Sequence, residues 1–252
     1  MKIFAHENLN RIDVLDERFY QVGDEYYPSV TTVLSAYPKG YGFQEWLKNV
    51  GGEAERILRE AADRGSNVHN AIEQILLGRE LQWITEGKQH YSLDEWQMIC
   101  RFMEFYQDYI QSGEQVATET QLFSKKMKLG GTCDMVAKIN GETWMIDFKT
   151  SNGLYKTHEI QLAAYKEMWD EHNSPKIDRY GILWLNSNHR TKRQFQGVDW
   201  QLKEFTDSHE YNLQLYYHTR ALWDCENPNY APKNLSYPNT ISIQPQEQLA
   251  EV

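Results

Sequence analysis

The chain has 252 residues, with 26 Lys and Arg against 36 Asp and Glu, a formal net charge of −10. This balance argues against a protein that coats nucleic acid with a basic surface, although an enzyme needs only a local basic track. No stretch approaches the roughly 20 apolar residues that span a bilayer, and the N-terminus carries no apolar signal segment. We therefore expect a cytoplasmic protein without a membrane partner.

Cysteines and basic runs are sparse. Cys100, Cys133 and Cys225 are far apart and form no CxxC pair, so neither a disulfide framework nor an iron–sulfur cluster is expected. Two basic runs, at 125–128 and 189–193, are either tracks for nucleic acid or solvated loops.

The first part of the chain, residues 1–113, is predicted to contain a hairpin followed by helices. Residues 11–28 have the pattern of a β-hairpin around Val22-Gly23-Asp24, and Ser29 can cap a short helix that reaches Ser35. Helical periodicity follows over 43–50, 53–64, 66–77 and 92–112, the last capped by Ser92. Gly65-Ser66 predicts a break between two of these helices, with the glycine ending one and the serine capping the next.

Strands dominate after residue 113. Strand character covers 115–123, 129–139, 142–149, 178–186 and 193–200, and helical character covers 157–171 and 201–224. Residues 226–252 are rich in Pro, Asn and other polar residues and are expected to form a loosely ordered tail. The order predicts an α/β (α+β) fold with a mixed central β-sheet flanked by helices. Residues 114–225 would form its core, and 1–113 an integral helical elaboration.

The clearest local feature is Asn140-Gly141 between two strand-like segments, a strong signal of a two-residue hairpin turn. With these residues as the loop, counting outward along both strands sets Asp134 opposite Asp147. The other face of this ribbon is expected to carry only apolar pairs: Ala137–Trp144, Met135–Ile146 and Cys133–Phe148. Lys149 lies one step beyond the two carboxylates, opposite Thr132.

Two carboxylates in this arrangement repel each other, because opposed Cβ atoms are only about 4.5–5.5 Å apart. A divalent cation such as Mg²⁺ or Mn²⁺ would neutralise them, whereas Lys149 alone would do so in part. Lys149 points to the same side as Asp147, where its ammonium can orient an attacking water. Asp134, Asp147 and Lys149 are therefore the predicted catalytic residues of a metal-dependent phosphodiester hydrolase.

These residues resemble the signature of the PD-(D/E)XK nuclease superfamily, which is carried here by Gly131–Asp134 and Asp147–Lys149, although Cys133 replaces the family's proline. Gln161–Tyr165 is similar to the QxxxY element of its RecB-like exonuclease branch. Gly65–His69, with Glu73 beyond, is similar to that branch's upstream helix with a metal-adjacent histidine. The segment 27–34, followed by Trp46, resembles the opening of phage exonucleases and of the mitochondrial genome-maintenance exonuclease.

The resemblance implies a restriction-endonuclease-like core and a metal-dependent DNA exonuclease that acts on single-stranded ends in replication, recombination or repair. It implies Mg²⁺ or Mn²⁺ bound by His69, Asp134, Asp147 and the backbone carbonyl of Phe148, with Lys149 as the catalytic partner. The phage-like opening suggests by analogy a viral source, and then the host cytoplasm as location. A structure-specific endonuclease and a non-catalytic DNA-binding protein with this fold remain alternatives.

The supporting residues have simpler explanations too. His69 and Glu73 share a helical face, as a buried His–Glu pair would. Gln161 and Tyr165 would position the catalytic residues or a phosphate, or else pack locally against the sheet. Glu119, on the first strand, is a weaker supporting candidate that could point either way. Four aromatic residues belong to the core or stack on unpaired bases: Tyr41, Phe43, Trp46 and Trp83.

Overall fold

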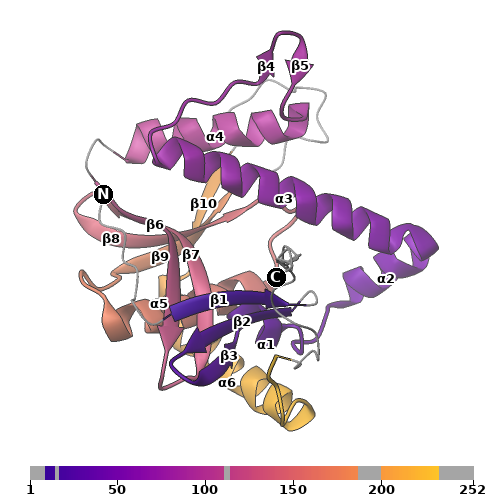
Figure 1. Cartoon of the computed structure of the whole chain (residues 1–252), viewed down its shortest axis with the longest axis vertical. Helices are drawn as coiled ribbons and strands as arrows, with labels where there is room; N and C mark the ends of the chain where they lie inside the picture. The colour runs from indigo at the N-terminus through magenta and orange to yellow at the C-terminus, as the bar shows by residue number, and fades with distance from the viewer. Residues whose placement is uncertain (1–8, 15–16, 111–113, 187–199, 233–252) are drawn as a thin grey trace, which may run out of the picture.

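The computed structural model describes residues 9–14, 17–110, 114–186 and 200–232 (Figure 1). Its centre is a five-stranded mixed sheet in the order β10-β9-β8-β7-β6. The strands are β6 (Gln115–Ser124), β7 (Leu129–Ile139), β8 (Glu142–Lys149), β9 (Arg179–Trp184) and β10 (Gln201–Glu204). Only the β8–β9 pair is parallel, because a helix connects these two strands. The predicted mixed sheet is confirmed.

Helices cover both faces of this sheet, which gives three layers. One face packs against α1 (Val30–Leu34), α5 (Lys156–His172) and α6 (His209–Glu226), and the other against α3 (Ala54–Leu76) and α4 (Leu93–Tyr109). Figure 1 shows α3 and α4 side by side above the sheet. Successive residues of β8 alternate between the two cores, since Met145 packs on the α5 side and Ile146 on the α3–α4 side. The sheet residues near the C-terminal end of β8 are thus enclosed by α3 and α5.

A second, three-stranded sheet precedes these layers and contacts β7. It consists of β1 (Leu9–Val14), β2 (Glu17–Val22) and β3 (Glu25–Pro28). The predicted hairpin is the β2–β3 turn, in which Gly23 has a φ of +62°, whereas the separate strand β1 was not predicted. Ser29 caps α1 as predicted, because its Oγ accepts the Thr32 N–H at 2.9 Å.

The helical region contains one wrong boundary. After α2 (Tyr41–Val50) and the 3-10 turn η1 (Gly51–Glu53), helix α3 runs through Gly65-Ser66 without a break. Gly65 is absent from the left-handed glycines of the described chain, and a Cβ at this position would lie 3.1 Å from Thr150 Oγ1. Gly65 therefore allows α3 to approach the end of β8, rather than ending a helix.

Beyond α3, a small hairpin joins β4 (Ile84–Thr85) to β5 (Lys88–Gln89), and Ser92 begins α4 as predicted, in a capping box with Glu95. Among the described residues, no helix combines the length and the apolar character that crossing a membrane requires.

The predicted helix over 201–224 is also wrong at its start, because 201–204 form the edge strand β10 and α6 begins only at His209. Pairing with the open edge of β9 satisfies this backbone and outweighs the helical pattern. The strand predicted over 193–200 lies outside the described residues except for Trp200, and so does the tail beyond residue 232.

Candidate active site

The Asn140-Gly141 turn sets the register of β7 and β8 as predicted, with positive φ at both residues. Pairing runs outward as far as Met135 opposite Ile146 and then stops. Beyond that point β7 stays paired with β6, while β8 stays paired with β9. The two central strands therefore fork, and the predicted catalytic residues lie just beyond the fork.

The fork changes how these residues face each other. The ladder pairs predicted beyond it are wrong; these are Asp134–Asp147, Cys133–Phe148 and Thr132–Lys149. The Phe148 N–H instead donates to Asp134 Oδ2 at 2.7 Å, so a side chain takes over a bond that the ladder would have made. Cys133 packs into the α5-side core although Met135 packs on the α3 side, which shows that the alternation of β7 is interrupted at Asp134.

Three side chains converge on the α3 side of the fork. Ligand atoms of His69, Glu119 and Asp134 all lie within 4.8 Å of one another. His69 Nδ1 on α3 is 3.5 Å from Asp134 Oδ1. Glu119 lies on β6 between Thr118 and Thr120, which pair with Met135 and Cys133 of β7, and it has a φ of +42°, which is unusual for a residue other than glycine. In this group of three, the carboxylate that Asp134 faces belongs to Glu119.

A second group lies on the α5 side and forms a closed ring of three side chains. Lys149 Nζ is 2.6 Å from Asp147 Oδ2 and donates to Gln161 Oε1 at 3.4 Å. Gln161 Nε2 donates to Asp147 Oδ1 at 3.3 Å and lies 3.1 Å from the Tyr165 hydroxyl. The ring holds the Lys149 ammonium in one position, and the predicted Gln161–Tyr165 pair supports that ring directly.

Buried carboxyl groups crowd at the fork and repel one another when they are ionised. Burial, reinforced by Asp134, raises the pKa of Glu119 to about 8 and that of Asp147 to about 6. Burial opposes protonation of His69, but Asp134 outweighs it and raises the pKa of the imidazole to about 9. The pKa of Asp134 is lowered, since His69 outweighs the effect of burial. A divalent cation would relieve this repulsion, and the imidazole and carboxylate donors fit one.

A family model, the PD-(D/E)XK nuclease superfamily, matches residues 42–234, which is more than half of the chain. The chain belongs to the PD-(D/E)XK nuclease superfamily. The match includes both groups of side chains at the fork, and the central mixed sheet with flanking helices is consistent with the restriction-endonuclease-like fold of this superfamily. Members of the superfamily are nucleases that use divalent metal ions, and the family implies a DNA substrate. No curated protein matches the chain.

Some predicted residues of this PD-(D/E)XK nuclease lie at the margin of the fork. Glu73 follows His69 by one turn of α3 and contributes to the raised pKa of Glu119, but it is outside the group of three converging ligands.

Of the two basic runs, only the first lies within the described residues. Its Lys128 pairs with Glu25 at 2.8 Å, whereas the run at 189–193 lies outside them.

The aromatic candidates differ in exposure. Tyr41 on α2 is 77% exposed, whereas Trp83 stacks on Trp96. The first is free to meet a ligand, while Trp83 is held in an aromatic cluster.

The sequence prediction missed His158. This residue lies three positions before Gln161 on α5, at a spacing that puts both on one helix face. Burial, with a contribution from the Lys149 ammonium, lowers the pKa of His158 to about 3. Its Nδ1 accepts the Tyr155 N–H at 3.4 Å. A neutral imidazole therefore extends the Gln161–Tyr165 face of the nuclease, and the spacing from Gln161 was the available signal.

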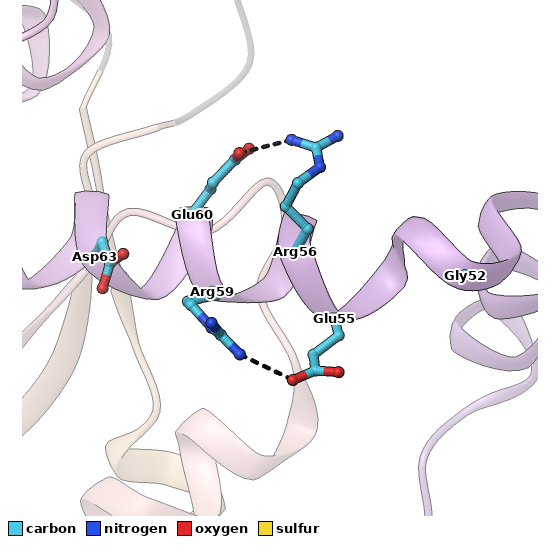
Figure 2. Close-up of a pocket in the computed structure, with 6 residues that line it drawn as sticks. All are labelled: Gly52, Glu55, Arg56, Arg59, Glu60 and Asp63. Atoms are coloured by element: carbon cyan, nitrogen blue, oxygen red, sulfur yellow. Dashed lines mark hydrogen bonds and ion pairs between the residues drawn. The ribbon is translucent and has the colours of Figure 1, made fainter.

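A hollow of about 430 Å³ on the nuclease lies along the first half of α3 (Figure 2). Four of its five charged side chains form ion pairs within the helix. Arg56 Nη1 is 2.6 Å from Glu60, and Arg59 Nη2 is 2.9 Å from Glu55, with the two pairs on opposite sides of the ribbon. None of the predicted site residues lines this hollow, so we assign it no part in catalysis.

Proposed function

We propose that this nuclease is a DNA exonuclease of the RecB-like branch that degrades single-stranded ends with Mg²⁺ or Mn²⁺. The observation that supports it most is the pair of groups at the fork: cation-type donors around Asp134, and beside them Asp147, which holds an oriented ammonium and whose pKa Asp134 raises. The QxxxY element supports the branch, because Gln161 contacts both Asp147 and Lys149. A general packing role for this glutamine would not require contacts with both.

In this proposal His69, Asp134, Asp147 and the Phe148 carbonyl hold the cation, and Glu119 joins them. A bound divalent cation supplies Lewis-acid polarisation of the phosphodiester and stabilises the charge on the leaving oxygen.

The ammonium of Lys149 orients the attacking water and stabilises the negative charge that develops on the phosphoryl oxygens. Gln161, itself bonded to Tyr165, keeps that ammonium beside Asp147. The cation donors and the ammonium thus have separate tasks, which separate variants can test.

The choice of variants matters because Asp134 has a structural task as well. Asp134→Ala would leave the Phe148 N–H without its acceptor, at a cost of about 1–3 kcal/mol in the free energy of unfolding. Asp134→Asn keeps an acceptor oxygen and removes the charge. Lost activity in Asp134→Asn, with an unchanged melting temperature, would therefore report on chemistry. Asp147→Asn and Lys149→Gln likewise remove the charge and keep a polar side chain of similar size.

The test uses single-stranded and duplex DNA, each linear with one labelled end or closed into a circle, with Mg²⁺, Mn²⁺ or EDTA. We expect progressive shortening of linear single strands, intact circles, and no cleavage with EDTA. Rapid cutting of the single-stranded circle would identify an endonuclease instead. Cleavage at the wild-type rate by Asp134→Asn or Lys149→Gln would refute the assignment of the site.

A further inference from the structure

Exposed aromatic and basic side chains gather where α5 begins and α6 passes it. Tyr155, immediately before α5, is 57% exposed, and Tyr211 on α6 is 59% exposed. Lys156 follows Tyr155, and its Nζ lies 5.0 Å from the centre of the Tyr211 ring. We call Tyr155, Lys156 and Tyr211 the α5–α6 strip. Few aromatic side chains of the described residues are exposed, and here two of them, linked by one lysine, form a distinct surface feature.

The strip lies at the start of the same helix that carries Gln161 of the active site. The Tyr155 ring meets the His158 ring edge to face, with centres 5.3 Å apart. His158 is in turn close enough to Lys149 to feel its charge, and it shares the α5 face of Gln161. Gln161, which contacts Lys149, is thus followed one helical turn towards the start of α5 by His158 and then by Tyr155, and Lys156 extends this surface to Tyr211.

We propose that the α5–α6 strip binds the bases of an unpaired DNA strand next to the phosphodiester that is cut. This inference rests on the proposed function, because it requires that the substrate strand passes Lys149. An unpaired base offers a flat face that stacks on an exposed tyrosine ring, and single-strand-binding proteins combine such rings with nearby cations. In a duplex these faces are already stacked within the helix. The strip therefore selects unpaired strands over duplex DNA.

The charges around the strip indicate that stacking, rather than attraction of phosphates, provides most of the binding energy. Lys156 Nζ is 2.6 Å from Glu159 Oε2, and Glu210 precedes Tyr211. The chain as a whole carries a net charge of −10. Binding at the strip displaces few counterions, so the affinity for a single strand should fall only slightly as salt increases.

The test measures fluorescence anisotropy of a short labelled oligothymidine strand, with Ca²⁺ in place of Mg²⁺ so that binding is observed without turnover. We expect Tyr155→Ala and Tyr211→Ala each to weaken binding about 5- to 100-fold, because stacking on one ring is lost. Tyr155→Phe and Tyr211→Phe should bind like the wild type, since the ring remains. The matched control is Tyr217→Ala, a 43% exposed tyrosine on α6 that borders Lys126 and Met127 instead and should have no effect.

The outcomes separate this inference from the proposed function. Wild-type affinity in both strip alanine variants, or an equal loss in Tyr217→Ala, would overturn the strip and leave the cleavage evidence untouched. A steep loss of wild-type affinity with salt would also contradict it, because phosphate contacts would then dominate. Lack of cleavage by the wild type would overturn the nuclease proposal, whatever the strip variants do. Competition with an unlabelled duplex completes the test, since the preference for single strands should decrease in Tyr155→Ala.

Discussion

Binding of a divalent cation should release protons, and their number tests which side chains hold the ion. At pH 7 a group with a pKa of about 8, such as Glu119, retains about 0.9 of a proton, and His69 with a pKa of about 9 retains nearly one. Asp147, with a pKa of about 6, retains about 0.1. Ligands must be deprotonated to bind, so a cation held by His69, Glu119 and the aspartates releases about two protons. Without a contribution from Glu119 the number is about one.

The direction in which cation affinity changes with pH follows from the protons that the free protein carries. Raising the pH from 7 towards 9 removes these protons in advance, so cation affinity should increase across this range and level off above it. The measurement is isothermal titration of the DNA-free protein with Mn²⁺, in two buffers of different ionisation enthalpy at the same pH. The difference in heat between the buffers gives the number of protons released. Glu119→Gln should release about one proton fewer than the wild type.

Two results would refute this reasoning. Release of less than about half a proton at pH 7 would mean that neither His69 nor Glu119 loses its proton when the ion binds. An identical number in Glu119→Gln and in the wild type would exclude Glu119 alone. His69→Gln serves as the matched second variant, because it removes the other proton and leaves the Glu119 contribution in place.

Three further changes test the ammonium, the packing of β7 and a helix cap. Lys149→Gln should lower single-turnover cleavage by about 10²–10⁴-fold while Mn²⁺ still binds, and an equal loss of Mn²⁺ affinity would contradict a role for Lys149 in orienting water. Gly130→Ala would place a Cβ 2.0 Å from Tyr20 Cγ and should lower the urea-measured free energy of unfolding by about 1–3 kcal/mol. Gly153→Ala, with no atom within 4 Å of its Cβ, is the control, and equal stability of the two variants would disprove the close contact. Ser92→Ala should lower the free energy of unfolding by about 1 kcal/mol in the same assay, because it removes the α4 capping box. Unchanged stability would mean that other contacts hold this helix end.

Signals confined to a few neighbouring residues predicted the structure well. The Asn140-Gly141 turn predicted a register that is correct up to the fork, and Ser29 and Ser92 cap the helices expected of them. Each of these signals acts through bonds within one turn, so no distant part of the chain is needed to interpret it. Gly65 was misinterpreted for the opposite reason. Its role depends on Thr150, which is close in space but distant in sequence.

The residues at the fork show where extrapolation from a turn must fail. A register counted from a hairpin assumes that the two strands remain neighbours, yet every inner strand of a sheet has two partners. Here β6 retains β7 and β9 retains β8, so the central pair separates once both outer pairings continue.

The separation leaves the Phe148 N–H free for the Asp134 carboxylate and turns Asp134 towards Glu119 and His69. Neither outer pairing can be counted from Asn140-Gly141, because each depends on strands outside that hairpin. The two predicted aspartates were therefore identified without their true neighbours. Glu119, one of the weaker sequence candidates, is the carboxylate that Asp134 faces.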